Sequence, residues 1–138
     1  MTPLFKKLNF KGQKEILLID PPSEFEEEII NMKKETSFKN HIGDCGEIEF
    51  VLAFVKTKKE IDKIFPVIQK KIKEDGIVWF AYPKGTSKKY KVEISRDKGW
   101  EELRKNGYDT VRAVSIDEDW SALRFRRVEF IKEMTRKR

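Results

Sequence analysis

The fold is decided by residues 76–91, GIVWFAYPKGTSKKYK. This segment starts as an apolar run from Ile77 to Tyr82 and changes at Pro83 into a basic loop that contains glycine. A short run rich in β-branched and aromatic residues, with Gly and Pro at its ends, is typical of a buried strand. Open α/β sheets bind ligands at the loops that follow the carboxyl ends of their strands. The segment therefore predicts a core strand that leads directly into a candidate binding loop.

Four other segments have the composition of strands. The first two are mostly apolar, as expected for central strands, and the last two are separated by a short polar turn, which predicts an antiparallel hairpin. We expect these strands at residues 15–20, 47–55, 110–116 and 120–127.

Helices are predicted between the strands. Ser23 with Glu26, and Thr57 with Glu60, have the spacing of capping boxes, in which each side chain binds a backbone amide of the first helical turn. Apolar residues at helical spacing follow both boxes. Pro66 is expected to kink or interrupt the second helix because proline removes a backbone donor.

The third helix is predicted to begin at Ser95 as its N-cap and to end at Gly107. Residues 39–46 are rich in Gly, Asn and Asp and predict a loop. We expect one domain over residues 1–138, with loosely ordered ends at 1–14 and 132–138. Alternation of strands and helices predicts a three-layer, Rossmann-like α/β fold with a mostly parallel sheet of five strands.

The composition limits the classes of function. The net charge is +6, but 30 Lys and Arg are mixed with 24 Asp and Glu, so nucleic acid is one possible partner among several anionic ones. A single cysteine excludes an intrachain disulfide and fits a reducing cytoplasm. We expect no secretion signal, because the first residues contain no continuous apolar segment, and no membrane-spanning run.

The part from Glu47 to Arg127 resembles the C-terminal half of class I AdoMet-dependent methyltransferase domains. The matching pieces are FVLAFV, a helix, Asp75-Gly76 before IVWFAY, Asn106-Gly107-Tyr108, and the pair VRAVSID and WSALRFRR. This resemblance implies the strand order 1-2-3-5-4, with the last-made strand inserted antiparallel.

The first half departs from that family. Methyltransferases place a glycine-rich turn after the first strand, where the backbone approaches the cofactor, and this chain has Asp20-Pro21-Pro22-Ser23 instead. The chain also has no room for the two strand-helix units that shape the adenosine pocket, and no acidic residue at the ribose position. We therefore expect no AdoMet in the usual mode and assign no cofactor.

Nearly the whole chain also resembles a family of short bacterial proteins catalogued as a domain of unknown function. The residues that carry this resemblance are LLIDPPSEF, WFAYPK and DEDWSALRF. It implies no activity.

Three connections are predicted at one edge of the sheet: Asp20–Ser23, Lys84–Lys91 and Asp117–Ser121. Lysines, hydroxyls and a glycine turn in the middle connection could hold a phosphate, or the segment could be a solvated loop. Asp20 could pair with Lys84, either to fix this edge or as an acid in a small cleft. The candidate ligand-binding residues are Asp20, Lys84, Thr86, Ser87, Lys88, Lys89, Asp117 and Trp120.

No catalytic or metal-binding residue is assigned, since the one histidine, His41, and the one cysteine, Cys45, do not suffice for a zinc site or a triad. The sequence thus favours a small non-catalytic binding or regulatory protein with a protein partner or an anionic ligand at Lys84–Lys91. One alternative is a nucleic-acid-binding protein that uses this loop and the basic tail, residues 124–138. Another is an enzyme that acts on a phosphorylated small molecule.

Overall fold

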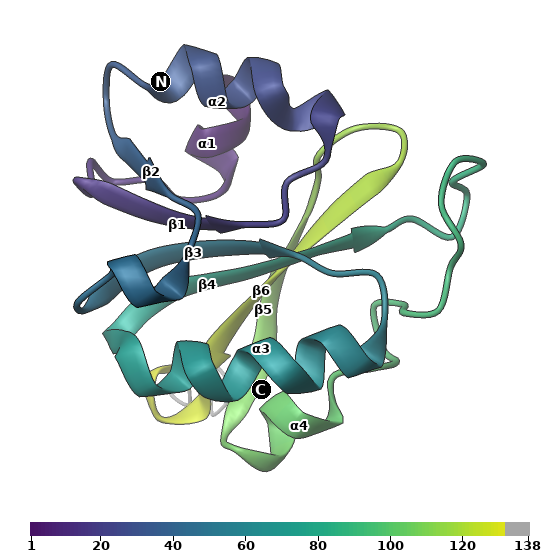
Figure 1. Cartoon of the computed structure of the whole chain (residues 1–138). Helices are drawn as coiled ribbons and strands as arrows, with labels where there is room; N and C mark the ends of the chain where they lie inside the picture. Colours follow the sequence, from purple (N-terminus) through teal and green to yellow (C-terminus); the bar gives the residue numbers. More distant parts are fainter. Residues whose placement is uncertain (132–138) are drawn as a thin grey trace.

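The computed structural model describes residues 1–131. It contains a six-stranded sheet in the order β2-β1-β3-β4-β6-β5, with helices on both faces (Figure 1). The strands are β1 (Glu15–Ile19), β2 (Ser37–Lys39), β3 (Ile48–Phe54), β4 (Ile72–Pro83), β5 (Tyr108–Ser115) and β6 (Trp120–Arg127). The helices are α1 (Pro3–Lys7), α2 (Glu26–Met32), α3 (Lys58–Lys71) and α4 (Glu101–Lys105), with single 3-10 turns at Ser23–Phe25 and Ile42–Asp44.

The predicted fold class and strand order are confirmed. The five predicted strands correspond to β1, β3, β4, β5 and β6, and they lie in the expected order 1-2-3-5-4. β1, β3 and β4 are parallel, whereas β6 runs antiparallel to both β4 and β5. The strand count was wrong by one: β2 pairs in parallel with β1, inside the segment where no strand-helix unit was expected. It has only three residues, too few to give a periodic signal.

The helices begin by different means. The Thr57 hydroxyl accepts a hydrogen bond from the Glu60 amide at 3.1 Å, which confirms the predicted cap of α3. Pro66 lies inside α3, which continues as one helix to Lys71. The other two predicted caps are wrong: Ser23 belongs to a 3-10 turn without a side-chain cap, and α4 begins after Trp100, five residues later than a Ser95 cap would place it.

The amino-terminal segment contains the helix α1, which packs on the sheet. The expectation of a loosely ordered arm at residues 1–14 is therefore wrong for α1. The Thr2 hydroxyl accepts from the Phe5 amide, and Pro3 occupies the first turn, where a proline costs no hydrogen bond. Phe5 and Leu8 are fully buried. The expectation for residues 132–138 lies outside the described residues.

Each face of the sheet has its own apolar core. Side chains of successive strand residues point to opposite faces, so β3 and β4, buried along most of their length, contribute to both cores. The core on one face lies under α1 and α2 and includes Phe25, Phe50 and Trp79. The core on the other face lies under α3 and α4 and includes Phe65 and Trp100. Figure 1 shows these helices above and below the sheet.

Candidate functional site at the carboxyl edge

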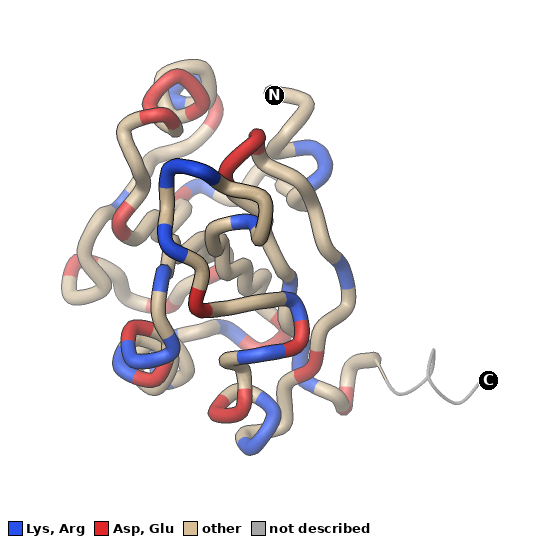
Figure 2. Tube along the Cα trace, turned by 90° about the vertical axis from the view of Figure 1, so that its right-hand side faces the viewer, with Lys and Arg blue, Asp and Glu red and all other residues tan. Residues whose placement is uncertain are grey.

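The three predicted connections do meet at one edge of the sheet. Asp20–Ser23 follows the carboxyl end of β1, and Lys84–Lys91 follows that of β4. The turn Asp117–Asp119 joins them because Trp120, the first residue of β6, pairs with Pro83, the last residue of β4. Figure 2 faces this side of the molecule and shows Lys and Arg positions interleaved with Asp and Glu positions along the backbone. We call this side the carboxyl edge.

A ligand crevice in an open α/β sheet lies where the chain direction across the sheet reverses. Here that switch point falls between β1 and β3, because the chain leaves β1 outward to β2 and leaves β3 in the opposite direction to β4. The helix that follows β1 covers one face and the helix that follows β3 covers the other.

The protein's own Tyr90 lies across the switch point. Its hydroxyl donates to Glu24 Oε2 at 2.7 Å, just after β1, and its ring centroid is 5.1 Å from the ammonium of Lys56, just after β3. The ring also packs against Trp120 with centroids 4.9 Å apart. The loop after β4 thus folds back and contacts the ends of both strands that border the crevice.

Glu24 is the polar centre of this contact. Its Oε2 accepts from Tyr90 and, at 3.0 Å, from the Trp120 indole, and its Oε1 accepts from the Lys89 ammonium at 3.2 Å. Partial desolvation alone would raise the pKa of Glu24. Hydrogen bonds from these three side chains and from the backbone outweigh that effect and lower the pKa from 4.5 to about 2. The carboxylate is therefore charged at neutral pH and holds the loop in place.

Two further contacts shape the loop itself. Ser87 Oγ donates to Asp119 Oδ1 at 2.9 Å and accepts from the amides of Lys89 and Tyr90. Asp117 Oδ1 accepts from the amides of Asp119 and Trp120, both at 2.8 Å, which closes the β5–β6 turn. Ser87 and Asp117, both candidate ligand-binding residues, thus use their side-chain oxygens to fix the backbone of the loop and of the turn.

An open hollow of about 270 Å³ lies beside the loop, on the α3/α4 side. It is lined by Tyr82, Lys84, Thr86, Arg96 and Ser121, together with Gly85, Val92, Ile94 and Ser95. Lys84 Nζ donates to Ser115 Oγ at 2.6 Å, which leaves further donor hydrogens on the ammonium. Two cations and several hydroxyls around one hollow form a surface that suits an anion.

A second hollow lies on the outer side of the loop. It is lined by Thr86, Lys88, Lys89, Glu118 and Asp119. Its two lysines face two carboxylates, so its charge is mixed and it selects an anion less well than the first hollow does.

The structure does not bring Asp20 and Lys84 together. The strand β3 lies between β1 and β4, so the two residues are not on neighbouring strand ends. Asp20 is exposed and has a positive φ of 52°. Trp120 is buried beneath Tyr90, which removes it as an exposed stacking surface.

Sequence reasoning missed Glu24, Lys56, Tyr90 and Arg96. An aromatic residue in a basic loop was the available signal for Tyr90, but loop composition does not indicate where a side chain packs.

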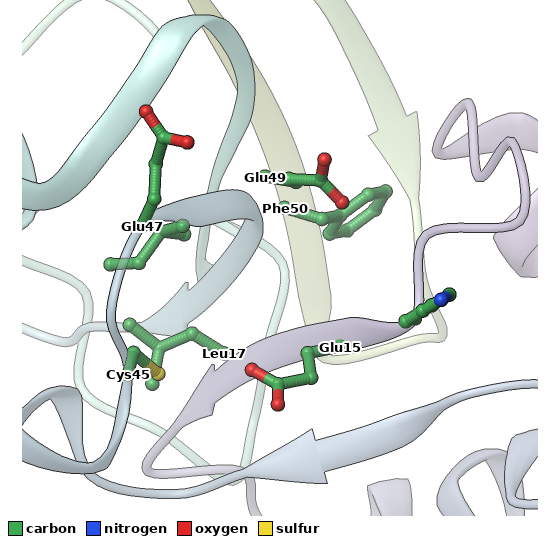
Figure 3. Close-up of a pocket in the computed structure, with 8 residues that line it drawn as sticks. Glu15, Leu17, Cys45, Glu47, Glu49 and Phe50 are labelled. Atoms are coloured by element: carbon green, nitrogen blue, oxygen red, sulfur yellow. The ribbon is translucent and has the colours of Figure 1, made fainter.

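A small cavity of about 160 Å³ lies at the opposite, amino edge of the parallel strands. Glu15, Glu47 and Glu49 line it with Cys45, but Figure 3 shows the carboxylates spread around the cavity and not directed at one point. Accordingly, no cluster that could hold a metal ion occurs among residues 1–131. Burial and the charge of Glu15 raise the pKa of the Cys45 thiol, which disfavours its reactive thiolate form.

Comparison with known structures places this chain among class I methyltransferase folds. The ribosomal protein L11 methylase of Lactobacillus delbrueckii subsp. bulgaricus aligns with a TM-score of 0.51 and 19% identity, over 84% of this chain and 59% of that chain. A putative type 11 methyltransferase of Sulfolobus solfataricus gives 0.51 and 11%, over 91% and 89%. Fibrillarin in the fibrillarin/Nop5p complex gives 0.50 and 10%, over 86% and 74%. At these identities the similarity establishes the fold.

No protein-family model and no curated protein matches the sequence. The resemblance to a family of short bacterial proteins therefore stays a prediction. Within residues 1–131, the helices are all too short or too polar to cross a membrane.

Proposed function

We propose that this chain is a non-catalytic binding or regulatory protein on a methyltransferase-like scaffold. One observation carries the proposal: Tyr90, held by Glu24 and Trp120, lies across the crevice where an open α/β sheet binds its ligand. The turn after β1 adds support, because Pro21 and Pro22 lack the amide hydrogens with which a turn can bind a cofactor's charged groups.

The ligand that suits the carboxyl edge is an anion, bound beside the crevice and not in it. Lys84 and Arg96 supply positive charge to the 270 Å³ hollow, and Thr86 and Ser121 supply hydroxyls. Arg96 is close enough to the Tyr82 hydroxyl to affect its pKa, although burial dominates and raises that pKa. The anion can belong to a small molecule or to an acidic protein partner in the cytoplasm.

The phosphorylated-substrate enzyme is a weaker candidate on this geometry. It requires Asp20, Lys84 and Asp117 to converge in one pocket, whereas Asp20 is exposed, Lys84 contacts Ser115 and Asp117 caps its own turn. These three groups have separate partners or surroundings and form no acid–base pair.

Thermal unfolding in the presence of AdoMet, inorganic phosphate and short oligonucleotides tests the proposal. A ligand at a hundred times its Kd adds about 2.7 kcal/mol of stability. We expect no shift with AdoMet and a saturable shift with phosphate that the double variant Lys84→Gln, Arg96→Gln loses. The variant Lys33→Gln, which changes an exposed charge after α2, should retain it.

Three outcomes would change the proposal. A shift with AdoMet would show that the Tyr90 contact opens and would contradict the non-catalytic assignment. A shift with oligonucleotides alone, fading as salt rises, would favour nucleic acid as the partner. No shift with any of the three would rule out a small anion at the hollow, and capture by an immobilised acidic peptide would then decide whether a protein partner binds there.

A further inference from the structure

Three arginines share one face of the β5–β6 hairpin. Arg124 and Arg126 alternate with Phe125 on β6 and therefore point to the α1/α2 face, as Ala122 does. Arg112 of β5 pairs directly with Arg124 across the hairpin and points the same way. Side chains at directly opposed positions lie about 5 Å apart at their Cβ atoms, and like charges there are destabilising.

Arg126 is paired with a carboxylate. Its Nε and one terminal nitrogen each donate to a different oxygen of Asp75, both at 2.7 Å. This two-bond arrangement raises the pKa of Arg126 and lowers that of Asp75. The carboxylate of Asp75 is thus committed to Arg126.

Arg124 lacks such a partner. Its Nε is buried and has no hydrogen-bond acceptor within residues 1–131. The opposite residue on β4 is Trp79, whose indole is fully buried and donates to the Leu8 carbonyl, so it accepts nothing from Arg124. Burial lowers the pKa of Arg124, and the charges of Arg126 and Arg112 lower it further.

A buried donor without an acceptor costs free energy and calls for a physical explanation. The positive charges of Arg124 and Arg112 also repel each other, and an anion bound between them would attract both. The guanidinium fork matches the oxygens of carboxylates and phosphates, and it binds them most strongly when water is partly excluded. Arg124 is half-buried, so water is partly excluded from its guanidinium, and the exposed Arg112 lies beside it.

We propose that Arg124 and Arg112 form an anion-binding site on the α1/α2 face of the β5–β6 hairpin, and that its ligand is a small molecule bearing a phosphate or carboxylate group. The accessible part of the Arg124 guanidinium donates to one ligand oxygen, and Arg112 contacts the same group from the solvent side. Arg126 stays bound to Asp75 and adds positive charge. This site is separate from the Lys84–Arg96 hollow, which lies on the other face of the sheet.

The Nε–H resonances of the arginines in ¹⁵N-labelled protein report on this site directly. Inorganic phosphate and citrate are titrated separately, with sodium chloride at matched ionic strength as the reference. We expect the Arg124 resonance to shift saturably with phosphate, citrate or both, while the Arg126 resonance stays in place. A response to phosphate alone identifies a phosphate ligand, and a response to citrate alone identifies a carboxylate ligand.

Variants separate this site from the carboxyl edge. Arg124→Gln should weaken the binding measured at Arg112 about tenfold or more, because it removes a charge-assisted hydrogen bond. Arg124→Met should do the same and also raise the Tm, since it replaces an unpaired buried charge with an apolar side chain of similar length. Lys84→Gln with Arg96→Gln should leave the Arg124 response unchanged.

Two results would overturn the proposal. One is an Arg124 Nε–H signal that responds to phosphate and citrate no more than to chloride. The other is a signal already shifted downfield in anion-free buffer, because that would reveal an acceptor within the protein. The Arg124→Met protein keeps the test valid if Arg124→Gln fails to fold.

Discussion

The two faces of the sheet are covered in different ways. On the α3/α4 face, apolar side chains form one core from Leu17 of β1 to Tyr108 of β5. On the α1/α2 face, the core is as apolar at β1 and β3, but toward β6 and β5 it gives way to arginines 112, 124 and 126. Its buried indoles are tied to distant segments, Trp79 to the Leu8 carbonyl and Trp120 to the Glu24 carboxylate.

This difference separates a face held mainly by apolar packing from a face that also depends on particular polar pairs. Burial of apolar area is non-directional, so the α3/α4 face gains its stability from any well-packed arrangement. The α1/α2 face depends on particular polar pairs, which fix the amino-terminal segment and the loop after β4. Both the Tyr90 contact with Glu24 and the three arginines of the β5–β6 hairpin lie on this second face.

Removal of the buried indoles should produce the largest effects and separate the two faces. Trp79→Ala and Trp100→Ala should each lower the free energy of unfolding by about 3–5 kcal/mol in urea titrations. Limited proteolysis should then differ between them. Trp79→Ala should expose the segment before Phe10, whereas Trp100→Ala should expose residues 92–99, because the Trp100 indole donates to the Ser95 carbonyl. Identical cleavage patterns would contradict the separate roles of the faces.

Loss of the Glu24 carboxylate should have the next largest effect. Glu24→Ala leaves the Trp120 indole and the Tyr90 hydroxyl without their acceptor and should cost about 2–3 kcal/mol at pH 7. The pKa of folded Glu24, about 2, lies below its ordinary 4.5. Its contribution is therefore complete above about pH 4.5 and is lost as the pH falls toward 2.

Thermal unfolding of wild type and Glu24→Ala from pH 7 to 2.5 measures this dependence. The difference in Tm between them should narrow below pH 4.5. Glu24→Gln, which keeps an acceptor oxygen, should lose less at pH 7. A difference that stays constant over the whole range would contradict the role assigned to the charged carboxylate.

Breaking the Asp75–Arg126 pair should have a smaller effect. Asp75→Asn keeps the positive φ of 56° that asparagine tolerates, and should cost about 1 kcal/mol because both side chains are partly exposed, at 32% and 28%. Glu49→Gln is a matched control, since it makes the same carboxylate-to-amide change in the more exposed pair with Lys73. That control should change the stability by less than about 0.5 kcal/mol in urea titrations.

An Asp75→Asn cost no larger than that of Glu49→Gln would show that the bidentate geometry contributes nothing. It would also remove the contrast between a paired Arg126 and an unpaired Arg124.

The sequence predicted most of the second half of the fold and little of the candidate site. The predicted strand at residues 120–127 coincides with β6, because Leu123 and Phe125 alternate with arginines and a polar turn precedes them. The buried run from Ile77 to Tyr82 was equally clear, although β4 starts earlier, at Ile72. Periodicity and turn chemistry are local, so they identify elements of this kind reliably.

The missed features depend on contacts between distant segments. The amino-terminal helix had a readable signal, Thr2 before Pro3 and Phe5 three residues before Leu8, but the basic character of residues 1–14 favoured an arm. Glu24 and Tyr90 are 66 residues apart, and no local rule joins them. The bond between Ser87 and Asp119 is likewise a product of the sheet order, which brings the β4 loop beside the β5–β6 turn.

The docking of α1 has a consequence for synthesis on the ribosome. Leu8 meets its partner Trp79 across a separation of 71 residues. At an elongation rate of roughly 5–20 residues per second, the nascent chain waits about 4–14 s between the two. During that interval the sheet that Phe5 and Leu8 cover is incomplete and the Leu8 carbonyl lacks its Trp79 donor, because β4 is not yet made. The first helix thus completes its packing late. A chaperone that holds apolar nascent chains has the longest opportunity to bind this segment.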